Sequence, residues 1–148
     1  MRKGGRVPVL ASLGDRGTFS VFSVFMFVSF ATQAAGLQLL VFSGEKSGNS
    51  KRWGEEVLPE YGESKFKRGL PLKIITIRGE VFPDWFDEAL KEDRVGEIIG
   101  TPTFIIWDEK NAREAGRLEG YTQKWKFYSR LDEALAMIEQ GLAPGRRE

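Results

Sequence analysis

The sequence predicts an α/β protein, a three-layer sandwich in which helices cover both faces of a mixed sheet of about four strands. Short apolar runs of strand length recur along the chain, and segments with apolar residues spaced three and four apart lie between them. Glycine, proline, serine and asparagine separate the two kinds of segment. After residue 35, the predicted order of elements is β-α-β-α-β-β-α.

The first strand is predicted at residues 37–43, where an almost continuous apolar run is typical of a strand buried on both faces. A turn of serine, glycine and asparagine follows it. Trp53, Val57 and Tyr61 then recur at i, i+4 and i+8, which predicts a helix that ends near Gly62.

The second strand is predicted at residues 71–77, with Pro71 at its start, where a sheet loses no hydrogen-bond donor. The second helix is predicted to open within residues 83–86, with Asp84 as its N-cap. The apolar side of this helix is formed by Trp85, Phe86, Ala89 and Leu90.

The last part of the chain predicts a hairpin and a helix. Residues 103–107 form an apolar strand, residues 108–111 a polar turn and residues 114–119 a weaker, more polar strand. A final helix is predicted to end near Gly141 and Pro144, before a frayed terminus at residues 145–148. Its apolar stripe is predicted at Trp125, Tyr128, Leu131, Leu135, Ile138 and Leu142.

Residues 1–34 have the features of a signal peptide. They hold four basic residues and one acidic residue, a net charge of +3, whereas the whole chain has +1. An uncharged apolar stretch follows the basic part, and the small residues after it suit cleavage after Ala34, with Ala35 as the next choice. The charge-free run 17–36 is also about long enough to span a membrane, so an uncleaved anchor that tethers the protein stays open. Both alternatives place residues 35–148, predicted to be one domain, outside the cytoplasm.

The composition excludes several classes of function. The chain has no cysteine, which removes disulfides, thiol chemistry and zinc-thiolate sites. It also has no histidine, which removes the most common general base and the Ser-His-Asp triad. A net charge of +1 gives no electrostatic argument for nucleic acid. We therefore predict no cofactor, no metal site and no nucleic-acid partner.

Motifs at a characteristic spacing stand at residues 39–42, 51–53, 56–61, 100–104 and 117–121. In this order they resemble the thioredoxin family, and in particular the periplasmic thioredoxin-like proteins associated with sulfur-oxidation gene clusters. The resemblance implies a compact thioredoxin fold over residues 37–142. It also places the family's Cys-x-x-Cys pair on Ser47 and Ser50, and the family's cis-proline on Pro102.

Serine at both positions is incompatible with thioredoxin chemistry. Thiol–disulfide exchange needs a thiolate that attacks and a second thiol that resolves the mixed disulfide. The hydroxyl of Ser47 does not ionise at neutral pH without a base, and a helix N-terminus contributes only about 0.3–1 kcal/mol toward a negative charge. For Ser47, Asn49 and Ser50, helix capping and turn formation are the ordinary roles, and contact with a ligand is the alternative.

Other motif interpretations are weaker. Residues 44–51 lie between a strand and a helix like a phosphate-binding loop, but Asn49 stands where that loop needs its second glycine. Residues 104–108 resemble the apolar strand and aspartate of a nucleotidase. The acidic clusters at residues 55–56 and 84–88 lack calcium-loop spacing and are predicted to be solvated helix faces.

The remaining candidate site is a peptide-binding groove. In the thioredoxin fold, as the resemblance implies, the residue before the cis-proline exposes backbone groups that pair with an extended peptide, which needs no thiol. This predicts a binding surface formed by Ser47, Gly48, Asn49, Ser50, Thr101 and Pro102. Trp53 or Ile99 could flank it, although the spacing of Trp53 also fits the core.

Three functions stay open from the sequence. The first is an exported, redox-inactive protein that binds an extracytoplasmic protein or peptide. The second is a thiol–disulfide oxidoreductase whose cysteines are replaced in this chain by Ser47 and Ser50. The third is a structural domain tethered to a membrane by its leader.

Overall fold

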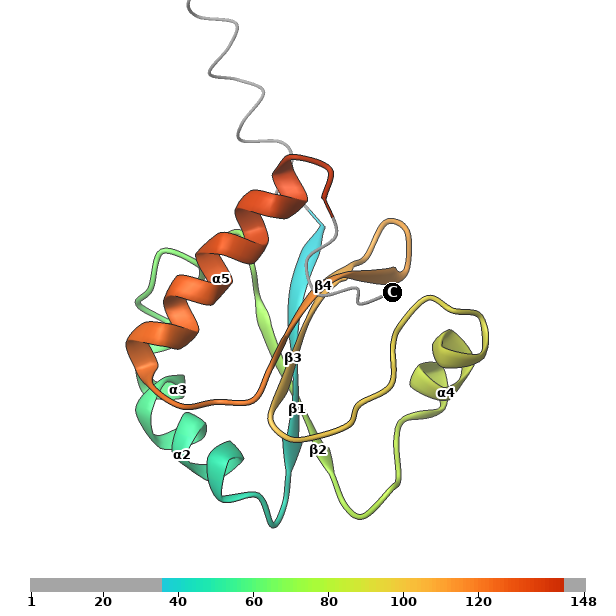
Figure 1. Ribbon diagram of the computed structural model, residues 1–148, viewed down its shortest axis with the longest axis horizontal. Helices are drawn as coiled ribbons and strands as arrows, with labels where there is room; N and C mark the ends of the chain where they lie inside the picture. The colour runs from blue at the N-terminus through green and yellow to red at the C-terminus, as the bar shows by residue number, and fades with distance from the viewer. Residues whose placement is uncertain (1–35, 143–148) are drawn as a thin grey trace, which may run out of the picture. The chain divides into compact units, whose positions relative to one another are not determined.

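A computed structural model describes residues 36–142 (Figure 1). Its sheet has four strands in the order β2-β1-β3-β4. The central strand β1 (Leu37–Gly44) pairs in parallel with β2 (Leu72–Ile77) and antiparallel with β3 (Thr103–Asp108). Strand β4 (Arg113–Glu119) pairs antiparallel with β3 and forms the opposite edge. The predicted mixed sheet is therefore confirmed.

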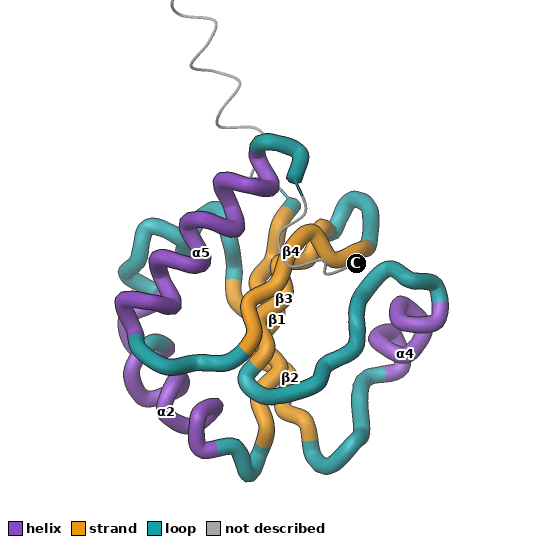
Figure 2. The backbone as a smooth tube through the Cα atoms, viewed as in Figure 1, coloured by secondary structure: helices purple, strands orange, loops and turns teal. Residues whose placement is uncertain are grey.

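Helices cover both faces of the sheet (Figures 1 and 2). Helices α2 (Gly48–Glu56), α3 (Leu58–Tyr61) and α5 (Lys124–Glu139) lie on one side, and α4 (Asp84–Lys91) lies on the other. Strand β1 contributes to both cores because successive side chains point to opposite faces. Leu39 and Val41 pack on the α2/α5 side, and Leu40 and Phe42 pack on the α4 side. The predicted three layers and doubly buried first strand are thus confirmed.

The first predicted helix is interrupted. It ends beside Gly62 as expected, but Val57 separates α2 from α3. Pro59 explains the break, since it has no N–H to donate to the preceding helical turn. Asp84 is not the N-cap of α4 as predicted. Pro83 occupies that position with extended backbone, and Asp84 is the first helical residue.

The last helix ends beside Gly141 as predicted, but the first and last residues of its predicted apolar stripe are wrong. Trp125 is 66% exposed, and Phe127 is the buried residue of the first turn instead. The helix ends at Glu139, and Leu142 lies beyond it. Gly141 has a φ of 76°, and Leu142 N–H donates to the Met137 carbonyl at 2.9 Å. This is a Schellman stop, which needs the left-handed backbone that glycine adopts readily.

The predicted leader and the predicted frayed terminus at 145–148 lie outside the described residues. Within residues 36–142, every helix is too short or too polar to cross a bilayer.

Candidate functional site

The turn between β1 and α2 is closed by its two serines. Ser47 is the N-cap of α2, and its Oγ accepts a hydrogen bond from Ser50 N–H at 3.2 Å. Ser50 is only 3% exposed, and its Oγ accepts from Gly44 N–H at 3.1 Å. The capping role predicted for Ser47 is confirmed. Gly48 and Asn49, which lie between the serines, are exposed.

A second segment, residues 100–103, lies against this turn. Ser47 Oγ donates to the Thr101 carbonyl at 3.1 Å, and the peptide bond between Thr101 and Pro102 is cis. Thr103 Oγ1 donates to the Gly100 carbonyl at 2.5 Å, which folds this segment on itself. The structure therefore brings together residues that stand far apart in the sequence, as the resemblance implied.

The approach of the two segments depends on a glycine at the end of β1. A Cβ added to Gly44 would lie 2.4 Å from Thr101 Oγ1 and 3.1 Å from Ser47 Cβ. Any side chain at this position would push the two segments apart.

Thr101 has one unused backbone donor. Its carbonyl accepts from Ser47, and the neighbouring Pro102 carbonyl accepts from Gly120 N–H at 2.9 Å. Thr101 N–H has no acceptor among residues 36–142, and the residue is half-buried. A group of this kind is available to a carbonyl oxygen from outside the protein.

Trp53 does not flank this surface. Its side chain is buried and packs against Phe104 and Phe127, with ring centroids 5.4 and 6.1 Å away. The core role that its spacing with Val57 predicted is the correct one. Ile99 is 86% exposed and does lie beside Thr101, where both line a pocket.

That open pocket, of about 480 Å³, lies on the α4 side of the sheet. No motif in the sequence indicates this pocket, because its lining residues come from separate segments of the chain. Its wall is mainly apolar, with two glutamates among the lining residues. They are Ile77, Gly79, Glu80, Phe82, Phe86, Leu90, Glu97, Ile98, Ile99, Gly100 and Thr101.

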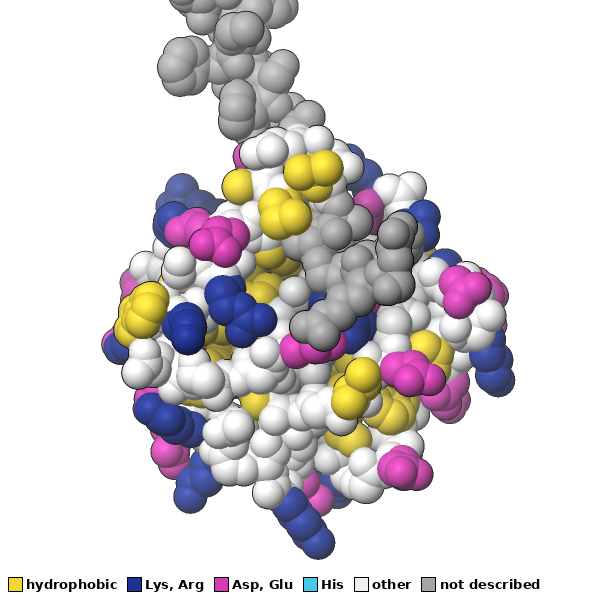
Figure 3. Space-filling model, in the orientation of Figure 1, with side chains coloured by type: hydrophobic (Ala, Val, Ile, Leu, Met, Phe, Trp, Pro, Cys, Tyr) yellow, Lys and Arg dark blue, Asp and Glu magenta, His cyan; other side chains and the backbone are white. Residues whose placement is uncertain are grey.

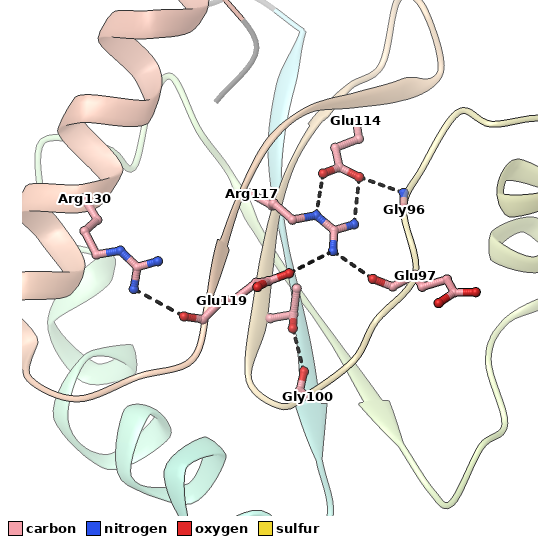
Figure 4. A network of polar contacts seen from close by, with 8 residues as sticks. Gly96, Glu97, Gly100, Glu114, Arg117, Glu119 and Arg130 are labelled. Carbon is pink, nitrogen blue, oxygen red and sulfur yellow. Dashed lines mark hydrogen bonds and ion pairs between the residues drawn. The ribbon is translucent and has the colours of Figure 1, made fainter. Parts of the chain in front are cut away.

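Arg117 on β4 holds the segment that leads to Thr101 (Figure 4). Its Nε and Nη2 donate to the two carboxylate oxygens of Glu114 at 2.6 and 2.9 Å. Its Nη1 donates to the Glu97 carbonyl at 2.8 Å, and Glu114 also accepts from Gly96 N–H at 2.9 Å. Hydrogen bonding to Glu114 raises the pKa of Arg117 above its usual range. In the sequence, Arg117 stands out only as part of the 117–121 motif, and nothing there indicates its bridge to Glu97.

Among the described residues, no base contacts the hydroxyl of Ser47. Its hydroxyl proton is directed at an amide carbonyl, which is too weak a base to activate an alcohol. No cluster of three or more metal-ligating side chains occurs within the described part of the chain.

Asp108, the aspartate of the nucleotidase interpretation, accepts hydrogen bonds from Asn111, which lower its pKa. Its carboxylate closes the β3–β4 turn.

The acidic clusters behave mostly as predicted. Asp84, Asp87, Glu88 and Glu55 are exposed. Glu56 is the exception, because it accepts hydrogen bonds from Arg52 and from Tyr121, which precedes α5.

No known family model and no curated protein matches this sequence. Solved structures do match it. The periplasmic thioredoxin SoxS from Paracoccus pantotrophus, in its reduced form, is 26% identical with a TM-score of 0.55, covering 68% of this chain and 96% of that one. A thioredoxin from Thermus thermophilus is 19% identical with a TM-score of 0.51, covering 74% and 82%.

The chain is therefore a protein of the thioredoxin fold. In particular, it resembles a periplasmic thioredoxin, with Ser47 and Ser50 where the Cys-x-x-Cys pair would stand and no cysteine anywhere in its sequence.

Proposed function

We propose that this chain is an exported thioredoxin-fold protein that binds an extended segment of an extracytoplasmic protein without any redox step. The observation that carries the proposal is the N–H of Thr101, which has no acceptor among residues 36–142. Thr101 contacts the Ser47–Ser50 turn and also lines the open pocket. An extended peptide that accepts a hydrogen bond there gains main-chain pairing, as in other strand-addition complexes.

The two serines support binding by keeping this surface in one arrangement. The Ser47 hydroxyl joins the turn to the Thr101 carbonyl, and the buried Ser50 hydroxyl joins α2 to the end of β1. A surface that is already ordered loses less conformational entropy when a partner binds. In this proposal, the two hydroxyl groups stand where the family has reactive thiols, but their role is structural.

Export is supported by the basic and apolar leader and by the periplasmic location of the similar SoxS protein. Expression of the full chain in a bacterium, followed by mass spectrometry of each cell fraction, tests it. We expect a periplasmic chain that begins at Ala35. A full-length chain in the membrane fraction would favour the tethered alternative, and a full-length chain in the cytoplasm would contradict export.

Peptide binding is tested with a random dodecapeptide library displayed on phage. We expect the wild-type chain and Thr101→Ala to enrich the same peptides, because both keep the backbone N–H. Thr101→Pro removes that donor and should lose them. Equal enrichment by all three proteins would contradict the proposal. If Thr101→Pro fails to fold, amide hydrogen exchange in the wild-type protein decides instead, since a bound peptide should slow exchange of Thr101 N–H.

A further inference from the structure

We propose that the pocket beside Thr101 selects partner segments in which an apolar side chain is accompanied by a nearby lysine or arginine. This inference rests on the proposed function and specifies the chemistry of the partner. It follows from the apolar wall of the pocket, the charge at its rim and the way in which that charge is held.

The floor of the pocket is apolar, and exposed apolar side chains stand at its edge. Phe86 belongs to the core on the α4 side of the sheet, and Ile98 packs partly against that core. Val81, between two lining residues, is 74% exposed, and Ile99 is 86% exposed. Figure 3 shows apolar side chains gathered on this part of the surface, with acidic side chains around them. Burial of an apolar partner side chain here removes exposed apolar surface on both molecules.

Among residues 36–142, the charged residues that line the pocket are Glu80 and Glu97. Neither carboxylate forms an ion pair with another residue of the described chain. The pocket therefore presents negative charge that no ion pair within residues 36–142 neutralises. A partner with lysine or arginine next to its apolar residue complements this charge, and a partner with aspartate or glutamate there is repelled.

The position of Glu97 is fixed by Arg117. The guanidinium group holds the Glu97 main-chain carbonyl, and the Glu97 carboxylate points away from Arg117 in Figure 4. The positive charge of Arg117 is taken up by Glu114, with a longer contact to Glu119 at 3.4 Å. A Cβ at Gly96 would lie 2.7 Å from Arg117 Nη2, so this segment fits closely against the guanidinium. The main chain at Glu97, one of the two acidic residues, is thus held by Arg117.

The experiment uses the same phage library with three forms of the full chain. They are the wild type, the double variant Glu80→Gln/Glu97→Gln, and the matched control Glu63→Gln/Glu109→Gln, whose glutamates are exposed and outside the pocket. We expect wild-type and control proteins to select peptides with an apolar residue near lysine or arginine and few acidic residues. The pocket double variant should lose the basic preference but still select apolar residues.

Affinity measurements on one synthetic peptide of the selected sequence complete the test. Loss of both charges should weaken binding about three- to tenfold at low salt, and the difference should shrink at high salt. Ile99→Ser, at an exposed position, should weaken binding without affecting folding. An unchanged affinity in the pocket double variant would overturn the inference.

The outcomes separate this inference from the proposed function. Peptides that depend on Thr101 N–H but show no basic preference would overturn the inference and leave the proposed function standing. Absence of any enriched peptide would overturn both. A second copy of the chain could also fill the pocket, and analytical ultracentrifugation of the free proteins tests this. If the wild type is a dimer and the pocket double variant is a monomer, a second copy occupies the pocket, and the inference is overturned.

Discussion

Ser47 and Ser50 each form a hydrogen bond that links two segments of the chain. Ser47 donates to the Thr101 carbonyl, and Ser50 accepts from the backbone at the end of β1. A buried hydroxyl needs such partners, since an unsatisfied one costs about 1–3 kcal/mol. These two residues therefore have structural roles that do not depend on any reaction.

A substitution at Gly44 tests how closely the end of β1 approaches Thr101 and Ser47. Gly44→Ala should destabilise the protein by about 1–3 kcal/mol, because its new methyl group would overlap Thr101 Oγ1 and crowd Ser47. Urea unfolding measures the change. The matched control is Gly48→Ala, where a Cβ meets no other atom and the helix should gain up to about 1 kcal/mol.

A double variant checks the stated cause. If the contact with Oγ1 is responsible, Gly44→Ala combined with Thr101→Ala should be less destabilising than the sum of the two single changes. Additive losses, or a Gly44→Ala protein as stable as the wild type, would show that the two segments are not held this closely.

The sequence identified part of the site at this scale. Ser47 could be predicted as an N-cap because serine before a helical stripe is a local signal. The pocket residues Phe82 and Ile98 could not be grouped, because they come from different segments and their proximity depends on the finished fold. Trp125 was misplaced for a similar reason: periodicity gives the spacing of a stripe, but the neighbours decide where the stripe begins.

At the scale of elements, Glu56 connects α2 to the segment between β4 and α5. Its carboxylate accepts hydrogen bonds from Tyr121 and from Arg52, which lower its pKa below the ordinary 4.5. A carboxylate with a lowered folded pKa stabilises the protein above its unfolded pKa, and this stabilisation is lost as the pH falls through the folded value.

Glu56→Gln should therefore lower the free energy of unfolding at pH 7, and the difference from the wild type should shrink as the pH falls below 4.5. Urea unfolding over a series of pH values measures it. Glu55→Gln is the control. Glu55 is exposed and its ion pair with Lys51 is long, at 3.9 Å, so the effect of this substitution on the free energy of unfolding at pH 7 should be smaller. A constant difference for Glu56→Gln at all pH values would contradict the assigned contact.

The elements themselves were largely predictable. Apolar runs identified β1, β2 and β3, and the more polar β4 was predicted as the second strand of a hairpin, after a polar turn. The break at Val57 follows from Pro59, a residue whose effect on a helix is known in advance. The bridge from Arg117 to Glu97 could not be foreseen, because it joins residues that only the folded sheet edge brings together.

At the scale of the whole molecule, the thioredoxin fold survives without its reactive pair because neither core depends on sulfur. One core is built around Trp53, Phe104 and Phe127, and the other around Phe42 and Phe86. Apolar burial of this kind is the dominant favourable term in folding. The site and the scaffold can therefore change separately.

Restored cysteines test this separation. The chain as it stands should not accelerate insulin reduction by dithiothreitol, whereas Ser47→Cys/Ser50→Cys should accelerate it. Cys at position 47 would lie at the N-terminus of α2, which lowers a thiol pKa, and position 50 is buried as suits a resolving thiol. Each single variant should be inactive, because one thiol cannot complete the exchange.

The activity of the double variant also shows whether the site has kept the geometry for thiol–disulfide exchange. Activity of the double variant means that the geometry for exchange is intact, which is compatible with the proposed binding function and with the alternative of an oxidoreductase whose cysteines are replaced in this chain. A folded double variant with two titratable thiols and no activity means that the surface around Ser47 and Thr101 has diverged from exchange chemistry. That second outcome would contradict the prediction and would leave the proposed main-chain binding at Thr101 and the tethered structural domain as the remaining alternatives.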